Sequence, residues 1–298
     1  MYNRAMLRAL LKTMRPRQWT KNAFLFAALV FDGKLFHPTD FLHTLAGFGL
    51  FCLISSAVYI FNDLLDVEAD RQHPVKKNRP IASGRLSPPV AVTAGTLLVL
   101  VTLATGTLLA WEFALTLLVY FALMLVYSKW LKHIPILDVL ILAAGFVLRV
   151  HAGTTLIIIE RFSPWLYVLM TLLALYLGFG KRRAELAQLV ESANSNAYPG
   201  SYRKVLDGYT IPLLDQFITI VSGTTILAYS LYTFFRLPDN HTLMLTIPFV
   251  IYAIFRYLYL IQVKNIGGEP EEILLSDRPF QISIFLWGLA VLAVFYLS

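Results

Sequence analysis

The chain has 298 residues, of which 57% are hydrophobic and only 14% carry a charged side chain. Together with a mean hydropathy of +0.65, this composition excludes an ordinary soluble domain and indicates a protein that spans a membrane. The formal net charge of +7 does not imply nucleic-acid binding by itself, and we expect no nucleic-acid partner because no such motif accompanies it. The single cysteine, Cys52, excludes an intramolecular disulfide.

Residues 1–19 place Arg4, Arg8 and Lys12 at near-helical intervals between apolar side chains. We therefore expect an amphipathic helix that lies on the anionic inner surface of a membrane. Nine apolar stretches then follow, each close to the length of a bilayer span. They are residues 19–36, 39–60, 88–108, 111–128, 135–157, 164–180, 212–235, 243–262 and 279–297. The chain is thus predicted to be all-α, a polytopic bundle of about nine transmembrane helices that forms one domain over residues 1–298.

Lysine and arginine are distributed unequally between the two sides of these spans. Twenty of the 25 fall in residues 1–21 or in four later loops, whereas only Lys34, Arg161 and Arg236 fall in the alternate segments. Because cytoplasmic loops carry an excess of these residues, we expect the N-terminus in the cytoplasm and the C-terminus outside. The predicted cytoplasmic loops are residues 61–87, 129–134, 181–211 and 263–278.

The second predicted span ends in a cluster of acidic side chains. Asp63, Asp66 and Asp70 follow i, i+3, i+7 spacing, which places their carboxylates on one face if the helix continues. Carboxylates at the end of a membrane helix are costly when unpaired and are usually functional. Mg²⁺ prefers such oxygen ligands and is commonly coordinated by the phosphates of a substrate as well. The cluster therefore predicts a magnesium site.

Basic side chains follow the acidic cluster at once. Five lysines and arginines lie within residues 71–85, and Arg79 is one of them. A solvated loop that obeys the positive-inside bias is the plainer interpretation of this run. However, carboxylates for a metal beside guanidinium groups for phosphate oxygens are what a diphosphate site needs. Later in the chain, Tyr127 and Lys132 precede the fifth span, which contains Asp138.

These motifs resemble those of a known family. Residues 62–70, followed by residues 78–80 and Gly84, resemble the first signature of the UbiA superfamily of intramembrane prenyltransferases. Residues 127–132 with Asp138 resemble its next block. The resemblance covers nearly the whole chain, and it implies nine spans with the N-terminus inside.

The same resemblance implies roles for the acidic residues. Asp63 and Asp66 are expected to hold Mg²⁺ on a diphosphate, and Asn62 is expected to supply an amide contact. Asp70 is expected either to bind the metal or to support one of its ligands. These are expectations from the family motif, residue by residue.

A second acidic motif, D-x-x-x-D, follows the sixth span in most members of the superfamily, and this chain departs from it. Three consecutive cations, residues 181–183, stand there with a single carboxylate, Glu185. We interpret the exchange as a sign of a site that holds more phosphate charge. The chain is instead similar to the decaprenyl-phosphate phosphoribosyltransferase branch. Four blocks carry that likeness: residues 14–22, the acidic motif, residues 180–186, and residues 268–272 with Asp277 and Arg278.

The branch resemblance implies a reaction and its location. A 5-phosphoribosyl group would pass from phosphoribosyl pyrophosphate (PRPP) to a polyprenyl phosphate such as decaprenyl phosphate, and pyrophosphate would leave. The expected location is the bacterial inner membrane, with the active site facing the cytoplasm. Lys132 and Tyr127 are expected beside the reacting groups. The candidates for phosphate or substrate contacts are Lys21, Arg79, Lys132, Arg149, Lys181 and Arg182.

Two other functions stay open from the sequence. One is transfer of a prenyl group from its diphosphate to an aromatic or quinone-like acceptor, which the first acidic motif permits and the missing second motif disfavours. The other is a membrane protein without enzymatic activity, such as a lipid-phosphate carrier or an assembly subunit. A homo-oligomer is also left open.

Several charged residues have two interpretations. Arg149 and Asp138 share a predicted span and a similar helical face, so they either line one polar cavity or pair with separate partners. Arg256 either contacts substrate or pairs within the bundle. Glu185 is either a remnant metal ligand or the partner of Lys181 one turn earlier.

Overall fold

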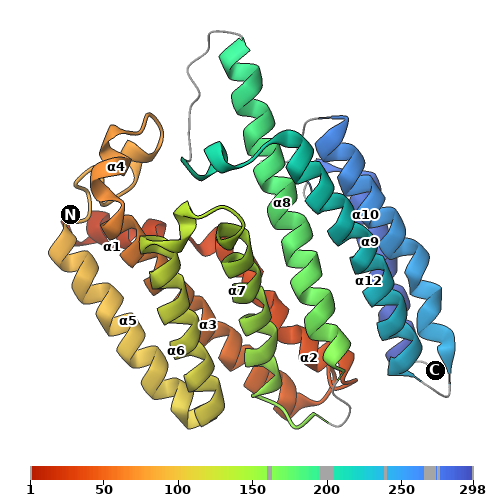
Figure 1. The fold of residues 1–298 in the computed structure, drawn as a ribbon. Coiled ribbons are helices and arrows are strands. Elements are labelled where there is room, and N and C mark those ends of the chain that lie inside the picture. The colour runs from red at the N-terminus through yellow and green to blue at the C-terminus, as the bar shows by residue number, and fades with distance from the viewer. Residues whose placement is uncertain are drawn as a thin grey trace. The chain divides into compact units, whose positions relative to one another are not determined.

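The computed structural model describes the chain in six stretches: residues 2–159, 163–194, 204–237, 240–264, 273 and 276–296. Every regular element in these stretches is a helix (Figure 1), which confirms the all-α prediction. The chain divides into two compact units, and each is described by itself. The first unit holds residues 1–134 and 145–160, and the second holds residues 135–144 and 161–298. That residues 1–298 act as one domain stays a prediction.

In the first unit, α3 is the central helix, and α5 and α6 pack against it. Prolines stand in the first turn of α3 and α5, where the missing N–H has no helical partner to lose. Short 3₁₀ helices (η) join the longer ones. The elements in chain order are α1 (Tyr2–Met14), η1 (Pro16–Leu25), α2 (Phe26–Phe31), α3 (Pro38–Leu65), α4 (Val67–Gln72), η2 (Lys76–Asn78), α5 (Pro88–Leu109), α6 (Trp111–Lys129), η3 (Leu131–His133) and the second half of α7 (Leu137–Thr154).

The first helix confirms part of the amphipathic prediction for residues 1–19. It ends at Met14, and it buries Ala9 and Met14 while Leu7 and Leu11 are exposed. Exposed leucines between basic residues are what a helix on a membrane surface presents. The placement of α1 on a membrane stays a prediction.

The first predicted span, residues 19–36, is wrong as a single continuous helix. A 3₁₀ helix of 10 residues occupies its beginning, and an α-helix of 6 residues follows. The backbone at Leu25 approaches α7 so closely that a Cβ on Gly153 would overlap its carbonyl group, which explains why glycine stands there. Further along, Phe26 contacts Phe41 and Phe48 of α3. The segment thus runs beside α3 as a mixed helix.

The second unit begins with the first half of α7 and continues with α8 (Pro164–Asn194), η4 (Lys204–Gly208), α9 (Ile211–Arg236), η5 (His241–Thr246), α10 (Ile247–Gln262) and α12 (Arg278–Tyr296). Helix α8 packs along α9, and α10 packs against α12. Their core is apolar and aromatic, with Tyr176, Phe179 and Tyr257 among its buried members. The predicted loop 181–211 is corrected at its start, because α8 continues without a break to Asn194.

Eight helices in the described stretches are long and apolar enough to cross a membrane. They match the second to ninth predicted spans. In the same stretches the mixed segment η1–α2 occupies the first predicted span, and the exact number of spans stays a prediction. The orientation of the two termini stays a prediction.

Candidate active site

The acidic motif lies where α3 ends and the chain turns into α4. Helix α3 stops at Leu65, and Asp66 caps it with φ −94° and ψ 4° before α4 begins at Val67. The spacing predicted that the three carboxylates share one face if the helix continues. The helix does not continue, so they do not share one continuous helix. Asp63 is on the last turn of α3, and Asp70 is on α4; both are buried, whereas Asp66 is half-buried.

Two guanidinium groups converge on Asp63. Arg15 Nη2 lies 2.5 Å from Asp63 Oδ1, and Arg79 Nη1 lies 3.2 Å from the same oxygen. Arg79 Nη1 also donates to Asp70 Oδ2 at 2.7 Å. Arg79 thereby bridges two buried carboxylates that would otherwise repel one another.

A third cation meets the remaining carboxylate. Lys132 lies on η3, directly after α6, and its Nζ is 2.6 Å from Asp66 Oδ1. These residues are 66 positions apart in the chain, and the family resemblance predicted that both belong to the site. We call the six residues the α3-end cluster: Asp63, Asp66, Asp70, Arg15, Arg79 and Lys132.

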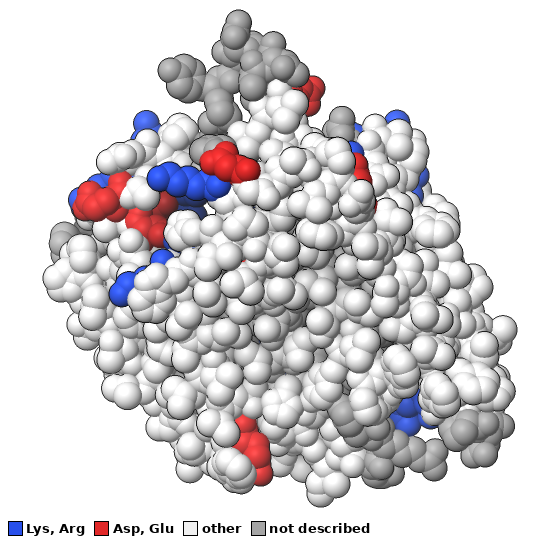
Figure 2. Space-filling view, viewed as in Figure 1, with Lys and Arg blue, Asp and Glu red and all other residues white. Residues whose placement is uncertain are grey.

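The surface around this cluster carries mixed charge. Figure 2 shows Lys or Arg side chains beside Asp or Glu side chains in the region where Figure 1 places α4. A broad uncharged surface lies below it in the same view. Clustered charge next to an uncharged face suits a site at the edge of a membrane.

The donor set of the α3-end cluster fits a divalent cation that is shared with a substrate. Each carboxylate uses one oxygen in the pairs above, and within the described residues the second oxygen makes no hydrogen bond. No three His, Cys, Asp or Glu side chains in those stretches gather into a cage for a metal. Mg²⁺ is commonly held by one or two carboxylates together with phosphate oxygens and water. A protein-only Mg²⁺ cage does not fit.

Three further predicted residues lie on neighbouring elements. Lys21 is half-buried on η1, and Tyr127 is half-buried near the end of α6. The backbone carbonyl of Asn62 accepts the N–H of Asp66 at 3.0 Å, which closes the last turn of α3. The side-chain roles predicted for these three residues stay predictions.

Arg149 is held by neutral protein groups and is only 6% exposed. Its Nε donates to Asn22 Oδ1 at 2.9 Å, its Nη1 to the carbonyl of Gly145 at 2.8 Å, and its Nη2 to the hydroxyl of Tyr120 at 2.8 Å. The guanidinium also lies over the rings of Tyr120 and Phe146. This arrangement favours a structural role over direct substrate contact.

Asn22 connects Arg149 to α3. While its oxygen accepts from Arg149, its Nδ2 lies 3.2 Å from Ser55 Oγ and 3.3 Å from Cys52 Sγ. The network therefore fixes η1, and with it Lys21, against α3. Asn22 lay inside a recognised sequence block, but its role depends on partners 30 and 127 positions away, which no local pattern reveals.

Arg182 is buried between carboxylates in the second unit. Its Nε is 2.6 Å from Asp138 Oδ2 and its Nη1 is 2.7 Å from Glu185 Oε2, and its side chain is 2% exposed. The hydroxyl of Tyr209 donates to Asp138 Oδ1 at 2.6 Å and accepts from the N–H of Ile136 at 2.6 Å. Burial, reinforced by the Asp138 carboxylate, raises the pKa of the Tyr209 phenol. We call Asp138, Arg182, Glu185 and Tyr209 the α8 cluster.

The neighbouring Arg183 is also used within the protein. It pairs with Asp215 at 2.7 Å and donates to the carbonyl of Ile261 at 2.8 Å. Two of the three consecutive cations are thus neutralised by carboxylates. The interpretation that they add charge for phosphate is therefore not supported for Arg182 and Arg183. Lys181 remains a candidate.

The structure decides in part between the two interpretations given above for each charged residue. Asp138 and Arg149 have separate partners, as one interpretation held. Glu185 forms an ion pair with Arg182, and its predicted pairing with Lys181 stays a prediction. Arg256 pairs with Asp277 through both oxygens, at 3.1 and 2.7 Å. This pair, with the N–H of Phe280, lowers the pKa of Asp277.

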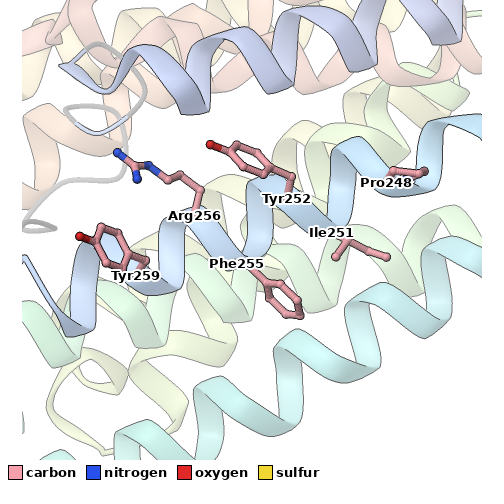
Figure 3. A pocket seen from close by; sticks show the side chains of 6 residues that line it. All are labelled: Pro248, Ile251, Tyr252, Phe255, Arg256 and Tyr259. Atoms are coloured by element: carbon pink, nitrogen blue, oxygen red, sulfur yellow. The ribbon is translucent and has the colours of Figure 1, made fainter.

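An open groove of about 480 Å³ runs along the outer side of α10 (Figure 3). Its lining comes from that one helix: Pro248, Ile251, Tyr252, Phe255, Arg256 and Tyr259. Apolar and aromatic side chains predominate, and Arg256 is already paired. The groove is therefore not a candidate for the reaction.

The acidic residues of the recognised block 268–272, Glu269, Glu271 and Glu272, lie outside the described stretches.

One member of the α3-end cluster that the sequence did not predict is Arg15. It lay in the recognised block 14–22, but no role was assigned to it. The structure places it on Asp63 and above the ring of Tyr59, 4.8 Å from the ring centre. The only local signal was an arginine directly before a proline at the end of a helix.

Comparison with known structures defines the class of protein first. The fold matches that of a UbiA homologue from Archaeoglobus fulgidus, solved with GPP and Mg²⁺ bound, with a TM-score of 0.68 over 96% of this chain and 99% of that one. The sequence identity is 20%, so the likeness concerns the fold alone. It confirms an all-helical UbiA fold.

The family follows from the sequence. The model of the UbiA prenyltransferase family matches residues 23–270, and the chain belongs to that family. It is 36% identical to a decaprenyl-phosphate phosphoribosyltransferase of Mycolicibacterium smegmatis, over 97% of this chain and 93% of that protein. A Mycobacterium tuberculosis protein of the same name is 34% identical over 93% of this chain and 90% of its own length. The chain is accordingly a membrane-embedded transferase of the UbiA family.

Proposed function

We propose that this protein transfers a 5-phosphoribosyl group from PRPP to decaprenyl phosphate or another polyprenyl phosphate. Two relatives named decaprenyl-phosphate phosphoribosyltransferase support this assignment, since their similarity to this chain covers almost its whole length. The Asp-rich motif and its cations support it from the chain's own residues. The alternative within the family is prenyl transfer to an aromatic or quinone-like acceptor.

The observation that carries the proposal is the composition of the α3-end cluster. Three carboxylates alternate with three cations in a space that is partly open, because Arg15, Arg79 and Lys132 expose 29%, 26% and 20% of their side chains. Carboxylates alone would suit a metal, and cations alone would suit a phosphate. Both together suit a metal that is bound to a diphosphate, which is how PRPP presents its leaving group.

One bond forms and one bond breaks in the reaction. A phosphate oxygen of the lipid attacks C1 of the ribose, and the C1–O bond to the diphosphate breaks. The leaving pyrophosphate takes the bonding electron pair. The lipid phosphate is already ionised near neutral pH, so the protein needs no strong general base. Positioning and electrostatic stabilisation of the leaving group supply the rate.

The residues are assigned roles on that basis. Asp63 and Asp66 hold the Mg²⁺, with Asp70 beside them as a further ligand or a support. A bound Mg²⁺ neutralises the charge that grows on the leaving diphosphate. Asn62 supplies an amide contact to the same group.

The partly exposed cations are assigned to the phosphate groups of the substrates. Arg79 and Lys132 contact the diphosphate, and Tyr127 is assigned to the reacting centre. Lys21 and Lys181 are assigned to phosphate oxygens on either substrate. The acceptor enters from the membrane, with its headgroup at the cytoplasmic face of the bacterial inner membrane.

Two predicted substrate contacts are reassigned as positioning residues. Arg149 orients η1 through Asn22, and Arg182 holds α7 to α8 through Asp138. Neither side chain has an exposed donor group to offer, because both are at least nine-tenths buried. Their loss is expected to act on the shape of the site.

A transfer assay tests the reaction class. Purified protein in detergent receives Mg²⁺, decaprenyl phosphate and PRPP labelled in the ribose. Label in the organic phase that disappears with EDTA is the expected result. No transfer from PRPP, with transfer from a prenyl diphosphate to an aromatic acid, would replace the proposal by the ordinary prenyltransferase activity. Silence with both donors would favour a binding role.

A further inference from the structure

Arg15 has an unusual backbone conformation at the corner between α1 and η1. Its φ of 52° and ψ of 62° are in the left-handed region, which side chains with a Cβ rarely adopt. The following residue is Pro16, and a residue before proline is restricted further toward extended conformations. Such a conformation persists only where the surroundings enforce it, and it often marks a functional site.

The surroundings of this corner are fixed on both sides. Before it, Ala9 and Met14 pack with Ile60 and Ile81 in one buried cluster. Ser56 of α3 also links both sides, since its Oγ donates to the carbonyl of Met14 and accepts from Trp19. The backbone of Arg15 therefore cannot relax without detaching α1 or η1 from α3.

The side chain that this corner presents is directed to a carboxylate. The guanidinium lies over Tyr59 and bonds to Asp63 Oδ1, the oxygen that Arg79 also contacts. Asp63 is 2% exposed, and a buried carboxylate without a positive partner is strongly unfavourable. Arg15 itself is 29% exposed, so it can leave Asp63 for water or for a phosphate, which the buried carboxylate cannot do.

We propose that Arg15 is a placeholder cation. It neutralises Asp63 in the substrate-free protein and releases this carboxylate when a divalent cation binds there together with the donor diphosphate. The freed guanidinium then faces the phosphate charge. This inference rests on the proposed function for the identity of the donor, but the competition at Asp63 is independent of it.

The competition has a measurable sign. Two cations that occupy the same carboxylate weaken one another's binding, and removal of one strengthens the other. Replacing Arg15 by a neutral residue should therefore tighten the binding of a divalent cation to the substrate-free protein. An arginine that only shaped the metal site would do the opposite, because its loss would disorder Asp63 and weaken metal binding.

The experiment measures Mn²⁺ binding by electron paramagnetic resonance on purified protein in detergent, without PRPP or lipid. For Arg15→Gln we expect binding about tenfold tighter than in the wild type, as for an opposite charge removed from a half-exposed pair. Arg15→Lys retains the charge and should lie between the two. Arg17→Gln removes an exposed cation two residues away and should change little.

A second background isolates the carboxylate. With Asp63→Asn in place, Arg15→Gln should no longer tighten Mn²⁺ binding. Equal or weaker binding in Arg15→Gln than in the wild type overturns the proposal, as does the same tightening in Arg17→Gln. If Arg15→Gln does not fold, Arg15→Lys gives the same comparison with a smaller expected shift. Because no PRPP is present, failure of the proposed transfer reaction would not affect these results.

Discussion

The α3-end cluster in the first unit and the α8 cluster in the second contain the same types of charged residue but differ in accessibility. The cations of the α3-end cluster expose a fifth or more of their side chains, whereas Arg182 of the α8 cluster exposes 2%. An ion pair that is partly exposed on both sides, such as Lys132–Asp66, contributes roughly 0–1 kcal/mol and can exchange partners. Breaking a buried pair costs about 3–5 kcal/mol, because one charge is left uncompensated.

The difference in side-chain exposure separates the cations that are proposed to bind substrate from those that are structural in this protein. Sequence position placed Arg79, Lys132 and Arg182 in one set of phosphate-binding candidates. Their burial divides them into two exchangeable cations and one that is committed to carboxylates.

The largest effect is expected in the α3-end cluster. Asp66→Asn should lower turnover about 1000-fold or more, because the leaving diphosphate loses stabilisation by a metal. The melting temperature should stay close to that of the wild type, since Asp66 is half-buried and its partner Lys132 is also partly exposed. The transfer assay and thermal unfolding in detergent measure the two quantities.

Glu68→Gln is the matched control, since Glu68 is exposed on the next helix and pairs with Arg71. It should leave activity nearly unchanged. Near-normal turnover in Asp66→Asn would remove this residue from the metal site.

The α8 cluster should show the reverse pattern. Arg182→Met should destabilise the protein by about 3–5 kcal/mol, because Asp138 would remain buried without its partner. Arg71→Met, which breaks an exposed pair with Glu68, should cost at most about 1 kcal/mol. Unfolding followed by denaturant in detergent compares them. An unchanged stability together with weakened PRPP binding would return Arg182 to the substrate-binding set.

Lys132→Ala should have an intermediate effect. The donor should bind about tenfold more weakly, because a charge-assisted contact to phosphate is lost. Stability should hardly change, since Asp66 can be solvated instead. Lys129→Ala, which removes an exposed cation from the end of α6, serves as the control. A donor KM equal to the wild-type value would exclude Lys132 from the site.

The smallest effect concerns the pair of Asp277 with Arg256. The pair lowers the folded-state pKa of Asp277 below its unfolded value of about 3.9. Its contribution to stability is therefore complete above the unfolded pKa, and it is lost as pH falls through the folded pKa. Asp277→Asn should lower the melting temperature slightly near neutral pH, and the difference from wild type should vanish in acid. A difference that persists in acid would show that the pair's charge is not responsible.

The sequence predicted much of the architecture. Seven of the long helices coincide with apolar runs whose length and flanking prolines are local properties of the chain, and α8 begins as expected at Pro164 but continues past its predicted end. The mixed segment η1–α2 was not predicted from hydropathy, which does not show contacts such as that of Asn22 with Ser55 of α3. Local composition cannot show such contacts.

The site was predictable to a similar extent. Family motifs assigned Asp66 and Lys132 to one site, and their side chains lie 2.6 Å apart, while their roles stay predictions. Spacing did not reveal that the helix stops at Leu65, nor that Asp138 and Arg149 on one helix have separate partners. Arg15 was missed because its place on Asp63 follows from a left-handed backbone angle, which the sequence hints at only through Pro16.

The central claim is that the α3-end cluster binds PRPP through a divalent cation. Equilibrium binding of radiolabelled PRPP to the purified protein, without lipid, tests it most directly. We predict saturable binding that requires Mg²⁺, is lost with EDTA, and is about tenfold weaker or more in Asp66→Asn but not in Glu68→Gln. Absence of saturable binding, or equal binding in wild type and Asp66→Asn, would contradict the claim.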